Sequence, residues 1–418
     1  MKIVLFCLLV TSLFASEKIL IVNEDDGVIK KEKKKKKKNK FIKKRDAKYP
    51  YTRYLKKLSN KKGIGKFDYK YRFGAQLSYD TGYIYEANNN YFRSLWRRVR
   101  VYHKGSFFNE KLFYELEYSF TGENNHKDIF VGYQNKIRSI KTNYRFKLGN
   151  IKIPFSLDRY SSSKNIMFME RALSDSFSEG RKLGAELLFS TKLPKSRFNF
   201  FSSVFTNSID EKLEDEVDQP GYSFRATYAY KFDKRHLFSF GTAYMGQDMK
   251  GENVRFNQAS ESELIEEKYV SVRIKDVNTV NKNNIEALYI NNKFTIQGEY
   301  TQTAVDALVN DYSFNGYYMQ GSYFLLGNGR KYKMRDATLA KVKPNKDGAL
   351  ELALRYSYVN LNDKDEHGGI QSDYTYGANW YINHEVKLMA NYIVAHPEGT
   401  DDYDGRLQIF QLRLLVAF

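Results

Sequence analysis

The sequence predicts an all-β chain, a transmembrane antiparallel β-barrel of about 16 strands with an inward-folded constriction loop. Three observations lead to this fold class. Aromatic side chains make up 16% of the 418 residues, and only six residues are Pro. Apolar and polar residues alternate at period two along many segments. The mean hydropathy of −0.61, with no apolar run of about 18 residues after the N-terminus, excludes a helical membrane protein.

Residues 1–16 predict a secretory signal peptide. Lys2 gives the segment a basic start, an apolar run follows, and Ala15 is the first of two small residues near its end. This order is typical of an export signal that is cleaved. The only cysteine, Cys7, lies within the segment. We therefore expect a mature chain without a thiol for disulfides or thiolate metal sites.

Residues 17–66 form a Lys-rich segment that we expect to be disordered. Residues 1–66 carry +15 of the formal net charge of +19, which leaves +4 for residues 67–418. Two interpretations of the run Lys33–Lys38 stay open. It is a solvated tail, or it binds anionic lipid headgroups or cell-wall polymer by charge attraction. Because the chain has a secretion signal, we expect no nucleic-acid partner.

From residue 67 onward the alternation predicts membrane-spanning strands. In the segments 222–232 and 350–358, apolar or aromatic residues alternate with polar and charged ones. The segments are close to the ~9–11 residues that a tilted spanning strand needs. Tyr and Phe stand at segment ends, where aromatic girdles form, and charged residues on the polar face suit a water-filled lumen. A membrane barrel is therefore favoured over a soluble sandwich.

The end of the chain supports this interpretation. In the final segment LQIFQLRLLVAF, alternate apolar residues share one face and the chain stops on Phe418. A terminal aromatic on such a strand resembles the assembly signal of bacterial outer-membrane proteins.

Connections of two lengths predict two different rims. Short turns are expected at Asn109–Lys111, Pro194–Arg197 and Asn383–Glu385. Long loops are expected at Asp210–Pro220, Gly246–Asn284 and Asn360–Asp373. Short turns that alternate with long loops are the layout of outer-membrane barrels.

The stretch Gly149–Gly184 predicts a strand, a long loop able to fold inward, and the next strand. It carries Arg159, Lys164 and Arg171 beside a run of three serines, residues 161–163. Cationic side chains with hydroxyl donors form an anion site, because they attract charge and replace the anion's hydration shell. The alternative is an external loop whose charges are solvated.

Arg97 and Arg98 are a second basic group. Consecutive residues of a regular strand point to opposite faces, and an arginine that faces lipid at mid-bilayer costs about 2–4 kcal/mol. At least one of the pair therefore faces the lumen. The other needs a bulge, a rim position or a subunit contact. The alternative is a pair of rim arginines that bind lipid headgroups.

Catalytic, metal and cofactor sites are not predicted. The six His residues are scattered, and no HExxH motif, Cys/His cluster or nucleophile elbow occurs. We expect no enzyme, no metal and no cofactor.

At this point the residues resemble a known family. The chain from residue 67 to 418 is similar to the phosphate-selective porins O and P of Gram-negative outer membranes. The resemblance rests on WRRVRVYHKGSFF at 96–108, KLGNIKIPFSLDRYSSSKNIMFMERAL at 147–173, GRKLG at 180–184, ANWYINHEVKLMANYIV at 378–394 and the ending IFQLRLLVAF.

The resemblance implies a 16-stranded barrel in lipid that assembles as a homotrimer and passes phosphate or polyphosphate passively. It also implies which residues bind the anion at the constriction. They are the arginine pair, two basic residues that flank the serines, two serine hydroxyls and the arginine of the ER motif: Arg97, Arg98, Arg159, Lys164, Ser162, Ser163 and Arg171.

One departure from the family weakens the expectation of phosphate specificity. The stretch Met245–Asp276 stands where family members carry a ladder of arginines, yet it holds five Lys/Arg against seven Asp/Glu, a net charge of −2. Two other functions stay open. One is a general, weakly selective porin. The other is a barrel that anchors a Lys-rich arm to cell-wall polymer.

Overall fold

A closed ring of strands forms the wall, which confirms the predicted fold class. The computed structural model describes residues 61–64, 67–86, 90–122, 124–210, 217–399 and 406–418. All of them belong to one compact unit, residues 55–418. The predicted signal peptide, 1–16, lies outside the described residues, as does the Lys-rich segment 17–66 except for residues 61–64.

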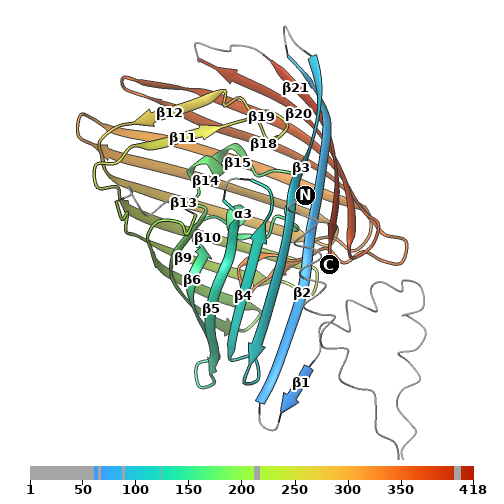
Figure 1. Cartoon of the computed structure of the whole chain (residues 1–418). Coiled ribbons are helices and arrows are strands. Elements are labelled where there is room, and N and C mark those ends of the chain that lie inside the picture. The colour runs from blue at the N-terminus through green and yellow to red at the C-terminus, as the bar shows by residue number, and fades with distance from the viewer. Residues whose placement is uncertain (1–60, 65–66, 87–89, 123, 211–216, 400–405) are drawn as a thin grey trace, which may run out of the picture. The chain divides into compact units, whose positions relative to one another are not determined.

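Sixteen antiparallel strands form the ring, and β2 pairs with both β3 and β21 to close it. Figure 1 shows the blue β2 beside the red β21 at this closure. The strands are β2 (Phe67–Tyr85), β3 (Asn90–Phe107), β4 (Leu112–Ser119), β5 (His126–Ile137), β6 (Thr142–Lys152), β7 (Arg181–Leu193), β8 (Ser196–Phe205), β9 (Gly221–Lys231), β10 (His236–Asp248), β13 (Val277–Asn291), β14 (Phe294–Ala307), β15 (Asp311–Leu326), β18 (Ala349–Asp363), β19 (Glu366–Tyr381), β20 (Val386–Glu398) and β21 (Leu407–Ala417).

The remaining elements are short. β1 (Lys61–Ile64) pairs with the start of β2. Two hairpins, β11 (Val254–Gln258) with β12 (Val270–Ile274) and β16 (Tyr332–Lys333) with β17 (Thr338–Leu339), lie within connections. The connection from β6 to β7 holds the helix α3 (Leu157–Tyr160) and the 3-10 helix η2 (Leu173–Phe177). In the described part of the chain, no helix has the length and apolar character to cross a membrane.

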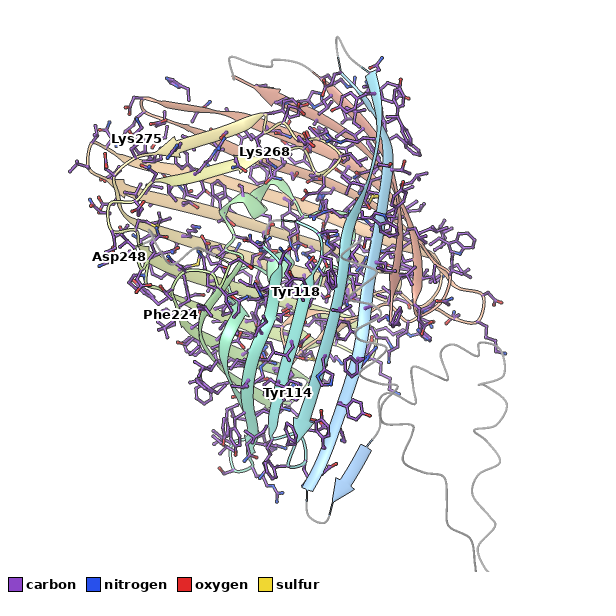
Figure 2. The ribbon with its side chains drawn as sticks, viewed as in Figure 1. Tyr114, Tyr118, Phe224, Asp248, Lys268 and Lys275 are labelled. Carbon is purple, nitrogen blue, oxygen red and sulfur yellow. The ribbon has the colours of Figure 1, made fainter. Side chains whose placement is uncertain are left out.

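The strands are apolar outside and polar inside, as the alternation predicts. Tyr118 and Phe224, labelled in Figure 2, face outward and are 38% and 41% exposed. On the last strand, Leu412 is 42% exposed whereas its neighbours Gln411 and Arg413 are buried inside. An apolar outer band around a polar interior is the arrangement that a lipid bilayer requires of a barrel.

The connections alternate between two rims. We call the rim that holds the connections 153–180 and 249–276 the loop rim, and the opposite one, with the connection 327–348, the turn rim. Two sequence predictions are wrong in detail. Asn360–Asp373 is mostly strand, because β18 reaches Asp363 and β19 begins at Glu366. The turn rim also carries one long connection, 327–348, where only short turns are expected.

Three connections fold into the barrel and pack by apolar contacts. In loop 153–180, η2 packs with the β11/β12 hairpin of loop 249–276 against β13–β15 and β18. Its helix α3 packs with the β16/β17 hairpin of loop 327–348 against β7–β10 and β13. Leu264 and Ile265 of loop 249–276 pack against β20 and β21. The inward folding predicted for Gly149–Gly184 is therefore confirmed, and two further connections share it.

A β-bulge lets both arginines of the pair face the interior. The pairing of β2 with β3 shifts by one residue between Ser78 and Tyr79, so Arg97 is the extra residue. Trp96 before it faces outward and is 55% exposed, whereas Arg98 after it is 2% exposed. An extra residue changes the phase of a strand, so two consecutive side chains lie on one face. Of the options left open by the sequence, the bulge is the one observed.

Deleting Arg97 should be tolerated better than deleting Val99. Without Arg97, Trp96 and Arg98 alternate as in a regular strand, and both keep their faces. Without Val99, a regular strand would turn Arg98 toward lipid, which costs about 2–4 kcal/mol. Urea unfolding in lipid vesicles should show the second deletion to be less stable by that amount. Equal stability would contradict the assignment of the bulge.

Candidate functional site

Local hydrogen bonds fix loop 153–180 inside the barrel. The side chain of Ser156 caps α3 by accepting a hydrogen bond from the backbone N–H of Arg159 at 3.1 Å. The backbone N–H groups of Leu157 and Asp158 donate to the carboxylate of Glu299 on β14, at 3.0 Å and 2.8 Å. The start of the loop is thus tied to the wall by a buried carboxylate.

A strongly basic cavity of about 740 Å³ lies between loop 153–180, loop 249–276 and the wall strands β3–β7. We call it the loop-side cavity. Among the described residues, ten Lys or Arg line it, against a single carboxylate, Glu263. The basic residues are Arg97, Arg98, Arg100, Lys127, Lys152, Arg159, Arg171, Arg181, Arg255 and Lys268. A cavity lined by one sign of charge concentrates ions of the opposite sign.

A second cavity, of about 380 Å³, lies toward the turn rim. Nine Lys or Arg residues line this turn-side cavity, against four carboxylates. Four residues line both cavities, and we call them the neck: Arg100, Lys152, Ser163 and Arg181. Two basic cavities with a shared boundary form a candidate path for anions.

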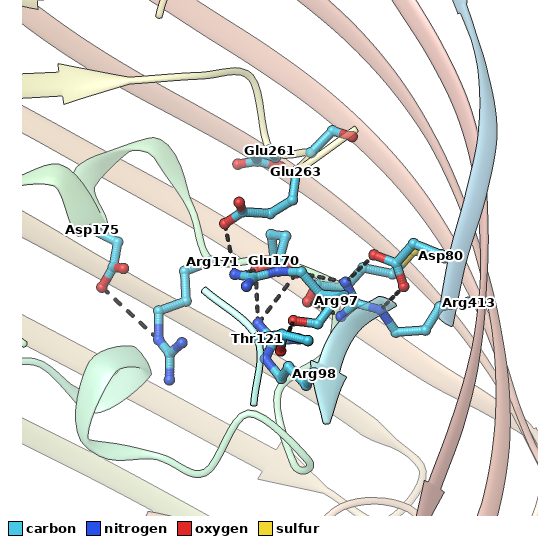
Figure 3. Close-up of polar contacts among 12 residues, drawn as sticks. Asp80, Arg97, Arg98, Thr121, Glu170, Arg171, Asp175, Glu261, Glu263 and Arg413 are labelled. Atoms are coloured by element: carbon cyan, nitrogen blue, oxygen red, sulfur yellow. Dashed lines mark hydrogen bonds and ion pairs between the residues drawn. The ribbon is translucent and has the colours of Figure 1, made fainter. Parts of the chain in front are cut away.

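Arg97 and Arg98 lie at the loop-side cavity, where Glu170 binds both of them (Figure 3). The carboxylate of Glu170 accepts hydrogen bonds from Arg97 at 3.0 Å and from Arg98 at 2.9 Å. Arg413 donates to it at 2.5 Å and to Asp80 at 2.6 Å. Burial alone would raise the pKa of Glu170, but the three arginine charges outweigh burial and hold this pKa well below its ordinary value. The carboxylate is therefore ionised.

The other predicted basic residues of loop 153–180 also reach the cavities. Arg159 pairs with Asp175 at 2.8 Å. Arg171 donates to backbone carbonyls, among them that of Ser161 at 3.1 Å, and its nearest carboxylates lie 3.9 Å away. Lys164 lines the turn-side cavity. The structure thus places the predicted basic residues along one candidate path and divides them between its two cavities.

The predicted serines take different positions. Ser163 lines both cavities, and Ser162 lines the turn-side cavity alone. The Oγ of Ser162 accepts a contact from the backbone N–H of Lys164 at 3.4 Å. Ser161 is fully buried, and its Oγ accepts from the backbone N–H of Leu339 on β17. Ser162 and Ser163 therefore offer hydroxyls to the path, whereas Ser161 fastens two loops together.

Lys164 has an unusual environment. Its Nζ lies 4.6 Å from the centroid of the Tyr102 ring. Burial lowers the pKa of Lys164 to about 8, with Glu117 opposing that shift and Lys104 adding to it. The side chain therefore changes charge near pH 8.

The acidic residues of Met245–Asp276 mostly avoid the cavity. Glu261 is buried against the wall and is bound by Arg355 and by Ser357. Only Glu263 among the described acidic residues of this stretch lines the loop-side cavity, together with Arg255 and Lys268. The part that faces the path is thus net positive, although the stretch has a net charge of −2.

Sequence reasoning missed several basic residues of the path. Arg100, Lys152 and Arg181 line both cavities, and Lys127 lines the loop-side cavity. A signal was present for Arg100, because it stands two residues after Arg98 and so shares its face. Lys152 and Arg181 stand at the two strand ends that flank the loop, where alternation does not define a face.

One group of carboxylates among the described residues is close enough to share a metal ion: Glu115, Glu117 and Asp128. Each of them is paired with a basic side chain. Lys104 lies 2.7 Å from Glu115, Arg181 lies 2.7 Å from Asp128, and Arg100 lies 3.4 Å from Glu117. The group therefore pairs with three of the nine basic residues of the turn-side cavity.

Comparison with known proteins gives one family and several relatives. Residues 67–418 match the family model described as phosphate-selective porin O and P. Porin O of Pseudomonas aeruginosa is 33% identical over 154 residues, which are 32% of this chain and 34% of that protein. A Caulobacter vibrioides protein without an assigned function is 26% identical over 289 residues, 63% of this chain and 57% of its own length. The chain thus spans less than two thirds of each relative.

Solved structures share the fold. OmpT, an outer membrane protein of Vibrio cholerae, covers 86% of this chain and all of its own at 12% identity, with a TM-score of 0.53. The outer membrane channel DcaP of Acinetobacter baumannii covers 86% of this chain and 99% of its own at 10% identity, with a TM-score of 0.51. At such identities the likeness is one of architecture.

Neutralising Glu263 should raise the preference of the pore for anions, because this residue is the carboxylate that lines the loop-side cavity. We expect Glu263→Gln to increase the chloride-over-potassium permeability ratio in planar bilayers. The control is Glu266→Gln, which removes the same charge from the same loop and also breaks a pair with an arginine of β3, Arg93. A larger effect of Glu266→Gln would contradict the assignment of the cavity lining.

Proposed function

The chain belongs to the phosphate-selective porin O and P family, and on this premise we propose that it lets small anions, phosphate or polyphosphate in particular, diffuse passively across the outer membrane of a Gram-negative bacterium. The observation that carries the proposal is the loop-side cavity, whose described lining has ten basic residues and one carboxylate. Membership of a porin family, rather than the lack of a catalytic motif, argues for a channel and against an enzyme.

The residues that we propose to bind the anion are those predicted from the sequence. Three observations support them. Arg97, Arg98, Arg159 and Arg171 line the loop-side cavity, Ser162 and Lys164 line the turn-side cavity, and Ser163 lines both. Guanidinium and ammonium groups bind oxyanions by charge-assisted hydrogen bonds, which are about twice as strong as neutral ones. Selectivity then needs binding strong enough to replace hydration and weak enough for release.

We include outer-membrane lipid and two further copies of the chain among the partners. The outward aromatic and aliphatic side chains, such as Phe224 and Leu412, support contact with lipid. The homotrimer is proposed from the family resemblance. A general porin is the alternative, and it differs in a measurable way, because its chloride current would not saturate or be blocked as phosphate is added.

The first test is phosphate block of the chloride current in single channels. We expect phosphate to block the native pore, and the double variant Arg171→Ala, Lys164→Ala to need a concentration at least about tenfold higher, since a hydrogen bond to a charged group is worth about 1.5–3 kcal/mol. Lys346→Ala, which removes an exposed lysine that lines neither cavity, is the control. Unchanged block in the double variant would remove both residues from the site.

The second test is the pH dependence of chloride selectivity, because chloride itself does not titrate. Lys164 is charged below its pKa of about 8 and neutral above it. We therefore expect the chloride preference to fall between pH 7 and pH 9. In Lys164→Arg the side chain stays charged over this range, so the fall should be smaller than in the native pore. If chloride selectivity depended on pH in the same way in the native pore and in the variant, the proposed role of Lys164 would be contradicted.

A further inference from the structure

The neck between the two cavities holds basic residues whose charge is less completely paired than that of Arg97 and Arg98. This contrast rests on the proposed function, since it concerns which residues hold the anion. Glu170 binds three arginines, Asp80 binds one of them, and Glu263 lies 2.6 Å from Arg97. Around the arginine pair, three carboxylates thus balance three arginines, and the group has no net charge.

Lys152 differs because its partners are uncharged. Its Nζ donates to the backbone carbonyl of Ser161 at 3.1 Å and to that of Arg159 at 3.4 Å. Arg171 donates to the same two carbonyls, at 3.1 Å and 3.4 Å. Among the described residues no carboxylate pairs with Lys152. Two basic side chains therefore lie side by side at the loop. Both are held by backbone carbonyls, and the nearest carboxylates of Arg171 are 3.9 Å away.

Arg100 and Arg181 add to this charge. Arg100 pairs with Glu117 at 3.4 Å. Arg181 pairs with Asp128 at 2.7 Å and shares Glu117 at 3.8 Å. The Nε of each arginine is buried without a hydrogen-bond partner among the described residues. The neck thus holds three basic side chains, Arg100, Lys152 and Arg181, against two carboxylates, Glu117 and Asp128. A buried donor without a partner is costly, and an oxyanion would supply the missing acceptor.

We propose that Arg100, Lys152 and Arg181 bind the transported oxyanion at the neck, together with Arg171 and the hydroxyl of Ser163, and that they determine its affinity more than Arg97 and Arg98 do. An anion that passes between the cavities meets all three residues, because they line both cavities. Arg97 and Arg98 bind the anion more weakly than the neck residues in this account. Both arginines hold loop 153–180 through Glu170, whose carboxylate already occupies part of each guanidinium group as a tethered anion.

The test compares single-charge variants of the neck and of the pair by phosphate block of the chloride current. Lys152→Gln leaves no carboxylate without its partner, and we expect it to raise the half-blocking phosphate concentration about tenfold. Lys152→Arg keeps the charge and should stay within about twofold of the native pore. Arg97→Gln removes an equal charge from the neutral group and should change the block less than Lys152→Gln.

Because Lys152 also contacts loop 153–180, a second neck variant guards against a purely structural effect. Arg181→Gln should raise the half-blocking concentration like Lys152→Gln, although it touches β5 and not the loop carbonyls. The proposal is overturned if Arg97→Gln weakens the block more than both neck variants, or if both neck variants leave it unchanged. A native pore that phosphate does not block would instead contradict the proposed function.

Discussion

The structure follows from one constraint, that no backbone polar group can be left unpaired in lipid. A strand that crosses a membrane needs a partner on each side, so the sheet must close on itself. Here β2 supplies the closure by pairing with β21 and β3. Closure divides every strand into a lipid face and a lumen face. The charged residues of the wall then collect inside, where they must find partners or bind ions.

Much of this interior charge is neutralised locally, and what is left over defines the path. In buried ion pairs such as Arg225 with Glu286 and Arg330 with Glu351, each charge has a partner of opposite sign. Glu170 neutralises part of the charge of the predicted arginine pair in the same way. The residual positive charge therefore lies between loop 153–180 and the strands β3–β7. An arginine near the pore contributes less to anion binding when a carboxylate already pairs with it.

The sequence reveals the wall better than the path, for physical reasons. Alternation at period two indicates that a strand has one buried face, so strands such as 222–232 can be recognised from the sequence. Alternation also shows that Arg97 and Arg98 cannot both face the lumen from a regular strand, so that a bulge or a rim position is needed. Only the pairing of β3 with β2 shows that the strand has a bulge. Asn360–Asp373 looks like a loop because its polar residues face a polar lumen. Sequence reasoning misses Lys152 and Arg181 because they flank the path only once the loop between them folds inward. It misreads Glu261 because that carboxylate pairs with residues of the wall and does not face the cavity.

The most direct measurement of the central claim is the reversal potential of the native channel in a potassium chloride gradient across a planar bilayer. The account predicts a reversal potential close to the equilibrium potential of chloride, because basic side chains outnumber carboxylates along the boundary that the two described cavities share. Since chloride and potassium ions have similar mobilities in water, a potential near zero would indicate an unselective pore. A potential on the potassium side would contradict the account outright.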